Sequence, residues 1–154
     1  VIDDYINNPD TDVITPVTRL SWEQLDKLRD QKLTNPFSGT TAILDKDRNA
    51  LWFSKNIIPA IRKEDKLRAL TEISPVYRHI GLYAYALPAL EKYVDLDEGG
   101  YEALEGLEQL RLLENNMRIR AVIVDYKDRP AMSGVDTPDD LARAEKLLKD
   151  FDEV

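Results

Sequence analysis

The sequence predicts an α/β fold, and two observations predict it. Segments rich in β-branched and aromatic residues alternate along the chain with segments that carry helical capping and spacing signals. The chain has 154 residues, of which 43% are hydrophobic and 32% are charged, a size and composition typical of one globular domain. We therefore expect residues 1–154 to form a single domain in which strands and helices interleave.

The first half of the chain is predicted to contain a strand, a helix and a hairpin. Val13–Thr18 is rich in β-branched residues, which favours a strand. Ser21 and Gln24 have the spacing of a capping box, which predicts a helix that starts after Ser21 and runs to about Asp30. Two β-like runs then flank a polar turn and predict a hairpin, namely Thr40–Leu44 and Ala50–Phe53.

The second half is predicted to begin with a charged connector over residues 56–70 that holds a short helix. Leucines recur at near-helical spacing within residues 101–115, which predicts one amphipathic helix that ends at Asn115 and Asn116. Thr137 and Pro138 are the N-cap and first-turn signals of a last helix. The expected strands are Tyr77–Tyr85 and Arg118–Tyr126, and the expected helices are Leu87–Tyr93, Tyr101–Asn115 and Thr137–Asp150.

The composition excludes several kinds of functional site. The 29 acidic and 21 basic residues give a formal net charge of -8, whereas nucleic-acid binding needs a basic surface. With no cysteine and one histidine, the chain cannot form disulfides, thiolate metal sites or sites built on two histidines. No apolar run approaches the roughly 20 residues of a membrane span, and no signal peptide is expected. We expect no nucleic-acid or membrane partner, and a cytoplasmic location fits the lack of cysteine.

The first candidate for a ligand-binding surface is the predicted strand Tyr77–Tyr85. The two-residue period of a strand places apolar residues on one face and, on the other, His79, Gly81, Tyr83 and Tyr85. A polar and aromatic face with a gap at Gly81 can receive a ligand. Alternatively, His79 and the tyrosines are partly buried and bond to backbone groups.

The second candidate lies on the predicted helix 101–115. Leu104, Glu108 and Leu112 form one row on that helix, and a carboxylate in an apolar row costs free energy unless it is paired or faces a cavity. Gly106 inside a helix costs up to about 1 kcal/mol relative to Ala. The close approach of a ligand explains both features. Alternatively, the row lies at the edge of the core and Glu108 is solvated.

The third candidate is Asp136, which precedes the last predicted helix. Helix capping explains the residues from Thr137 onward, but it does not explain Asp136, which follows a flexible Ser-Gly pair. A loop carboxylate beside a sheet is a usual Mg²⁺ ligand. Most such residues are merely solvated, so both interpretations stay open.

Four segments match one family in order and at compatible spacing. They are Ala50–Pro59, Arg78–Tyr83, Leu107–Arg111 and Gly134–Leu141. Over roughly Val13 to Leu148, the chain resembles the C-terminal portion of the 3-deoxy-manno-octulosonate (Kdo) cytidylyltransferases, also called CMP-Kdo synthetases.

The resemblance implies a Rossmann-like α/β domain with part of the nucleotide-diphospho-sugar transferase fold, and it implies a homodimer. The implied enzyme is a Mg²⁺-dependent cytidylyltransferase that transfers CMP from CTP to the anomeric hydroxyl of a Kdo-type sugar acid and releases pyrophosphate. Its product is used in lipopolysaccharide biosynthesis. The sequence does not distinguish Kdo from its 8-amino analogue, which differs at one substituent.

The resemblance also implies roles for individual residues. Asp136 is the implied Mg²⁺ ligand and catalytic residue, near the triphosphate and the sugar. Lys55 and Arg62 lie where the family places basic residues near the sugar acid. The family more often has Arg where Lys55 stands, and Lys lacks the bidentate geometry of Arg. The residues implied to line the sugar pocket or bond the sugar hydroxyls are His79, Tyr83, Glu108 and Gln109.

The sequence also departs from the family pattern. A phosphate-binding loop rich in Arg, Lys and Gly, and an Asp that supplies the other metal ligand, would precede Val1. The chain also begins without Met, so we expect the sugar-binding and dimerising portion of an enzyme, with no turnover by this chain alone. An alternative is a non-catalytic α/β interaction or dimerisation module on the same scaffold. The related cytidylyltransferases for sialic acid are a nearer alternative than such a module. The segment Arg78–Gly81 favours the Kdo enzymes over them.

Overall fold

The computed structural model of the protein describes residues 1–126 and 138–150, and the chain divides into two compact units. The first unit is Val1–Val124 and the second is Asp125–Val154, which contains helix α7 (Pro138–Asp150). Helix α7 agrees with the last predicted helix, whose expected N-cap Thr137 lies outside the described residues. The single domain expected over residues 1–154 stays a prediction.

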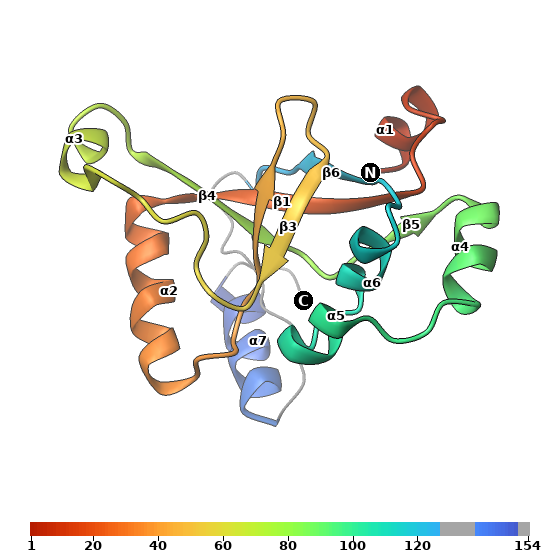
Figure 1. Ribbon diagram of the computed structural model, residues 1–154. Helices are drawn as coiled ribbons and strands as arrows, with labels where there is room; N and C mark the ends of the chain where they lie inside the picture. The colour runs from red at the N-terminus through yellow and green to blue at the C-terminus, as the bar shows by residue number, and fades with distance from the viewer. Residues whose placement is uncertain (127–137, 151–154) are drawn as a thin grey trace. The chain divides into compact units, whose positions relative to one another are not determined.

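One mixed sheet organises the first unit (Figure 1). Its strands are β1 (Val13–Ser21), β2 (Thr41–Leu44), β3 (Ala50–Ser54), β4 (Ile73–His79), β5 (Ala84–Tyr85) and β6 (Ile119–Ile123). Strand β1 pairs antiparallel with β4 and β5 along one edge and parallel with β6 along the other. Strand β2 pairs with β4, and β3 completes the sheet through the β2–β3 hairpin. The sheet confirms the predicted α/β class, and both hairpin strands agree with their predicted bounds to within one residue.

The sheet curls so that the turn of the hairpin reaches back to β6. The amide of Ala121 in β6 donates a hydrogen bond of 2.8 Å to the carbonyl of Arg48 in that turn. The next turn residue, Asn49, forms an antiparallel bridge with Arg120. These contacts satisfy backbone groups on the edge of β6 that faces away from β1, so part of that edge is covered.

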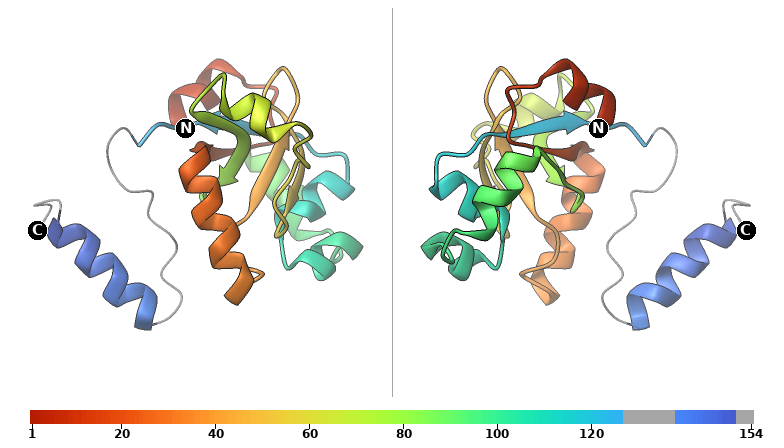
Figure 2. Two further views of the ribbon diagram at one scale, coloured as in Figure 1. Left: turned by 90° about the vertical axis from the view of Figure 1, so that its left-hand side faces the viewer. Right: turned by 90° about the vertical axis from the view of Figure 1, so that its right-hand side faces the viewer.

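Helices lie on both faces of the sheet, as the two side views show (Figure 2). Helix α2 (Trp22–Thr34) covers one face, while helices α4 (Leu87–Val94) and α6 (Gln109–Glu114) pack against the other. The other helices of this unit are α1 (Ile2–Asn7), α3 (Glu64–Arg68) and α5 (Gly100–Glu105). None of the helices that the structure describes has the length and apolar character of a membrane span.

The start of α2 confirms the predicted capping box. The amide of Gln24 donates to the Ser21 hydroxyl over 3.1 Å, and the amide of Ser21 donates to the Gln24 side-chain oxygen over 2.9 Å. The helix continues to Thr34, beyond the predicted end near Asp30. Its apolar residues Leu25 and Leu28 are buried, so packing extends the helix further than the local capping signals indicate.

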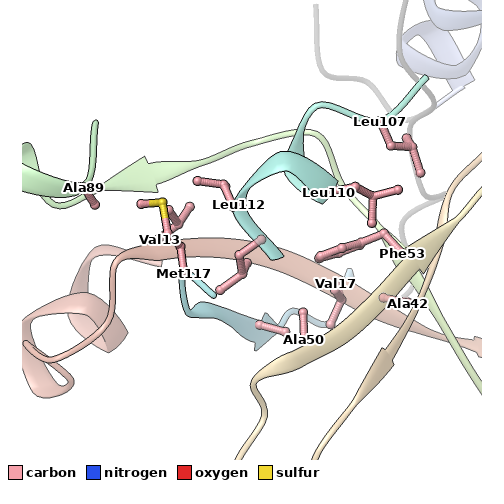
Figure 3. Close-up of a cluster of buried hydrophobic side chains, with 12 residues drawn as sticks. Val13, Val17, Ala42, Ala50, Phe53, Ala89, Leu107, Leu110, Leu112 and Met117 are labelled. Carbon is pink, nitrogen blue, oxygen red and sulfur yellow. The ribbon is translucent and has the colours of Figure 1, made fainter. Parts of the chain in front are cut away.

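The two faces of β1 bury two separate apolar clusters. Val13 and Val17 belong to the larger cluster, whereas Leu20 belongs to the smaller one under α2. This alternation follows from the two-residue period of a strand. Figure 3 shows how side chains from the strands and from α6 meet in the larger cluster, with Phe53 among them. The face that holds the larger cluster is also the face on which His79 lies, because His79 pairs directly with Val17.

The predicted strand Tyr77–Tyr85 is interrupted, which corrects the sequence analysis. Strand β4 ends at His79, and β5 begins only at Ala84. Between the pairs Val17–His79 and Ile14–Ala84, β1 advances three residues while its partner advances five, so the partner carries two extra residues. This is a bulge, and it cannot be read from β-propensity because it depends on how β1 is paired.

The predicted helix 101–115 is also interrupted. Gly106 ends α5 in the left-handed region with φ 61°, and α6 begins three residues later. The break turns Leu104 outward, to 81% exposure, while Leu107 and Leu110 enter the core. The prediction that Leu104, Glu108 and Leu112 form one row on a single helix is therefore wrong. Gly106 is a C-cap and carries no mid-helix cost. The predicted αL stop is confirmed at Asn116, with φ 56°.

We predict that Gly106→Ala lowers the free energy of unfolding by about 1 kcal/mol, because an L side chain is disfavoured at positive φ. A Cβ at Gly106 would meet no atom within 4 Å, so the cost is conformational and not steric. Urea denaturation measures it. Gly81→Ala is the matched control, because that site is equally open and lacks a positive φ. Equal effects of the two substitutions would contradict the conformational explanation.

Candidate functional site

The bulge after β4 brings His79 and Tyr83 together. Their ring centroids are 5.5 Å apart, whereas residues four apart in a straight strand are separated by about 13 Å. The Thr15 hydroxyl in β1 is 2.8 Å from the carbonyl oxygen of Leu82 and 3.3 Å from that of Ile80. Thr15 is fully buried, so its side chain satisfies carbonyl groups that the interrupted ladder leaves without a strand partner.

His79 is held in one orientation by three neighbours. Its Nε2 atom is 2.8 Å from Thr15 Oγ1, and its ring lies against Phe53 and Tyr83. Since the single hydroxyl proton of Thr15 is donated to a carbonyl, Nε2 of His79 carries the proton in this bond and Nδ1 has the lone pair. Burial, followed by the positive charge of Lys55, lowers the pKa of His79 to about 4. The ring is therefore neutral at pH 7, with Nδ1 as an acceptor.

A row of tyrosines continues from His79 towards α6. Tyr83 and Tyr85 have ring centroids 6.2 Å apart, and Tyr85 and Tyr93 have centroids 5.9 Å apart. At the end of the row, the Arg111 guanidinium lies 4.9 Å from the centroid of Tyr93. Burial raises the pKa of Tyr85 to about 12 and raises that of Tyr83 as well. These hydroxyl groups therefore stay protonated and can both donate and accept hydrogen bonds.

Glu108 and Gln109 stand at the start of helix α6, as its N-cap and first residue. The negative charge of Glu108, whose side chain is exposed, contributes to the raised pKa of Tyr83 and also acts on Tyr85 and Tyr93. Gln109 is 2% exposed, and its Nε2 atom has no hydrogen-bond partner within the described residues. A buried amide that lacks a partner costs about 1–3 kcal/mol, so Gln109 retains an unused donor.

A partly buried ion pair fixes the orientation of α6. Two nitrogens of Arg111 bond the two carboxylate oxygens of Glu102 in α5, at 2.6 and 2.7 Å. The amide of Gly99 donates to the same carboxylate over 2.9 Å. The guanidinium lowers the pKa of Glu102, which keeps this carboxylate charged. The pair spans the break at Gly106 and so determines where Glu108 and Gln109 lie.

The structure brings together most, but not all, of the residues expected in the sugar pocket. His79 and Tyr83 are in contact, Glu108 lies near Tyr83, and Lys55 is close enough for its charge to act on His79. The convergence of a strand face and a helix end is thus present, although the strand is bulged and the helix is broken. The described contacts do not join Arg62, which is exposed in the turn before α3, to this group. Asp136 lies outside the described residues.

Three residues that shape the site were not singled out from the sequence. Thr15 belongs to the predicted β-rich run and Glu105 to the predicted helix 101–115, whereas Lys32 lies just beyond the helix expected to end near Asp30. Each of them bonds backbone groups. Thr15 reaches carbonyl groups 65 and 67 residues away, and Glu105 reaches an amide 50 residues away. Lys32 bonds three carbonyl groups within seven residues and that of Lys55, which is 23 residues away. No local sequence signal marks such contacts. Within residues 1–126 and 138–150, no group of three His, Asp or Glu side chains could hold a metal ion.

The fold is that of the nucleotide-diphospho-sugar transferases, as a solved structure shows. The chain matches a CMP:2-keto-3-deoxy-manno-octonic acid synthetase complexed with CTP, with a TM-score of 0.76 and 27% sequence identity. The match covers 97% of this chain and 54% of that one.

The chain belongs to the cytidylyltransferase family, because the sequence model of the family described as "Cytidylyltransferase" matches residues 5–119. It is 42% identical over 141 residues to a 3-deoxy-manno-octulosonate cytidylyltransferase from Maricaulis maris, covering 92% of this chain and 52% of that protein. A protein of the same name from Bacteroides thetaiotaomicron is 44% identical over 110 residues, which cover 70% of this chain and 41% of that protein. The chain thus spans about half the length of the curated relatives it matches.

We predict that acidification destabilises the protein through His79. Its pKa is about 6.5 when unfolded and about 4 when folded, so between these values the unfolded state binds more protons and stability falls as pH falls. The full shift corresponds to roughly 3 kcal/mol. The measurement is urea denaturation at a series of pH values from 4 to 7.

The matched variant is His79→Gln, which removes the only histidine of the chain. The free energy of unfolding of this variant should depend less on pH than that of the unaltered protein. The slopes of the two curves against pH should differ by an amount that corresponds to up to about one bound proton. Carboxylates with lowered pKa, such as Glu102, contribute equally to both proteins and cancel in the difference. Parallel stability curves between pH 5 and 6.5 would show that His79 is not held neutral by the fold.

Proposed function

We propose that the protein carrying this chain transfers CMP from CTP to the anomeric hydroxyl of Kdo or 8-amino-Kdo and releases pyrophosphate, for lipopolysaccharide biosynthesis. The family and the names of its relatives support a CMP-Kdo synthetase activity. The observation that carries the proposal is the contact of His79 with Tyr83 across the bulge, with the charge of Glu108 at the start of α6 acting on Tyr83. A sugar with many hydroxyl groups requires such converging donors and acceptors.

In this proposal the described residues bind and orient the sugar. Glu108 and His79 Nδ1 accept hydrogen bonds from sugar hydroxyls, and Gln109 donates from its otherwise unpartnered Nε2. Tyr83 contributes a hydroxyl and an apolar ring face. Lys55 supplies a positive charge for the sugar carboxylate, and Arg62 is proposed as a second cation on the family resemblance alone.

The reaction itself depends on position more than on covalent help from the protein. The anomeric oxygen forms a bond to the α-phosphorus of CTP, the bond between that phosphorus and the bridging oxygen breaks, and the hydroxyl proton is lost. Holding the hydroxyl in line with the leaving group supplies much of the rate enhancement of such displacements. The rigid sites on the bulge and on α6 are suited to that task.

We propose Asp136 as the Mg²⁺ ligand and catalytic residue on the basis of the family resemblance. Bound Mg²⁺ would neutralise phosphate charge. Within the described part of the chain, no group of three His, Asp or Glu side chains could hold the ion, and Asp136 lies outside that part. The proposal also places the protein in the cytoplasm, where CTP is available.

The alternative of a non-catalytic interaction module is not favoured. The site keeps a buried, unpartnered Gln109 and a histidine held neutral beside Lys55, which a module that only needs the scaffold does not require. The relatives described above are named for Kdo and not for sialic acid, which supports the Kdo assignment.

We predict that the chain forms a homodimer, as the family resemblance implies. Helix α4 supports association because it exposes an apolar row at i, i+3 and i+7, with Leu87 at 68%, Leu90 at 41% and Val94 at 69% exposure. Sedimentation at micromolar concentration should give the mass of two chains. A species with the mass of one chain would argue against an interface within these residues.

We predict that Glu108→Ala raises the KM for Kdo by roughly five- to a hundredfold, because a sugar hydroxyl loses its acceptor in the complex. The KM for CTP should change little. Steady-state kinetics of the full-length protein test this, with the exposed Glu72→Ala as the matched control. Unchanged KM values, or equal changes for both substrates, would remove Glu108 from the sugar pocket.

A further inference from the structure

The backbone of Lys55 is held at both of its polar atoms by opposite charges. Its amide donates to Oε2 of Glu105 over 2.8 Å, and its carbonyl accepts from Nζ of Lys32 over 2.5 Å. Glu105 is the last residue of α5 and Lys32 lies in the last turn of α2, so two separate helices meet at this one residue. We call this arrangement the Lys55 clamp.

Glu105 is also fixed by the residue before Lys55. The hydroxyl of Ser54 donates to Oε1 of Glu105 over 2.7 Å, and the same hydroxyl oxygen accepts from the amide of Asn56 over 2.9 Å. Both carboxylate oxygens of Glu105 are thus occupied. The end of β3 is held at three successive residues, although the strand itself stops at Ser54.

Lys32 is occupied in the same way. Its ammonium group bonds the carbonyl oxygens of Lys55 at 2.5 Å, Gly39 at 3.0 Å and Pro36 at 3.3 Å, and also that of Ser38. An ammonium has three protons, so these four carbonyls use all of its donor capacity. Burial, followed by the positive charges of Lys55 and Arg78, lowers the pKa of Lys32, and the charge of Glu105 opposes this. Lys32 therefore acts on backbone and is not available to a ligand.

We propose that Lys32 and Glu105 are positioning residues that aim the Lys55 ammonium at the carboxylate of the sugar acid. The proposal rests on the proposed function, in which Lys55 recognises that carboxylate. A lysine is a flexible point charge, whereas an arginine at such a site is oriented by its own bidentate geometry. With Lys at this position, direction has to come from the backbone, and the clamp supplies it beside His79, on which the Lys55 charge acts.

A clamp that merely ties loops together would stabilise the fold without affecting recognition of the carboxylate. The two roles differ in one measurable quantity, the ratio of the dissociation constants for the methyl ester of Kdo and for Kdo itself. The ester keeps the hydroxyl groups and lacks the negative charge. If Lys55 binds the carboxylate through its charge, the unaltered full-length protein should bind Kdo more tightly than the methyl ester by roughly tenfold or more.

The test is a double-mutant cycle on that ratio, measured by titration calorimetry. Lys55→Met should abolish the preference for Kdo, and Glu105→Gln should reduce it by about fivefold, because an amide cannot accept both bonds. In the double variant, Glu105→Gln should have no further effect, since it acts only through Lys55. Lys32→Met should behave as Glu105→Gln does. Lys46→Met and Glu91→Gln, at exposed positions, are the matched controls.

The outcomes separate the clamp from the function on which it rests. Binding of neither ligand by the unaltered protein would overturn the proposed function and the clamp together. A preference for Kdo that survives in both clamp variants, or that falls additively with Lys55→Met, would overturn only the clamp. If Glu105→Gln and Lys32→Met fail to fold, Ser54→Ala is the substitute variant, because it removes only one hydrogen bond to Glu105. It should reduce the preference for Kdo by about threefold. An unchanged preference in Ser54→Ala would also overturn the proposal.

Discussion

The two extra residues opposite β1 are the constraint on which the rest of the site depends. They interrupt the strand between His79 and Ala84, and the buried hydroxyl of Thr15 occupies the position where ladder hydrogen bonds are missing. A regular strand would place the rings of His79 and Tyr83 too far apart to share a ligand. The irregularity is therefore what places the two rings side by side on one face of the sheet.

The other half of the site is built by helices that are too short to be stable alone. Helices α5 and α6 have six residues each, and the Glu102–Arg111 ion pair joins them across the left-handed turn at Gly106. Breaking such a pair by removing one partner leaves an uncompensated buried charge, which is strongly unfavourable. The pair thus makes the angle between the helices a fixed property, and the position of Glu108 depends on that angle.

The sequence predicted features that depend on local chemistry and missed those that depend on distant partners. The capping box of Ser21 and Gln24 lies within four residues and was found. Gly106 was noticed as unusual, but its role as a C-cap follows from the burial of Leu107 and Leu110 in a core assembled from remote strands. In the candidate site, residue types pointed to His79 and Tyr83, whose rings are in contact, while the roles of the site residues stay predictions. The backbone contacts of Thr15, Lys32 and Glu105 have no counterpart in composition or spacing.

The contact between the hairpin turn and β6 has a consequence for how the chain acquires its structure during synthesis. Arg48 and Asn49 meet partners more than 70 residues later, at Ala121 and Arg120, and β1 gains its parallel neighbour only when residues 119–123 are present. Pairings of such wide sequence separation are slow to form, because loop closure precedes the gain from contact. A nascent chain that has emerged only as far as β4 exposes one full edge of β1. The first unit therefore folds as a whole after its last strand has left the ribosome, and that edge needs protection until then.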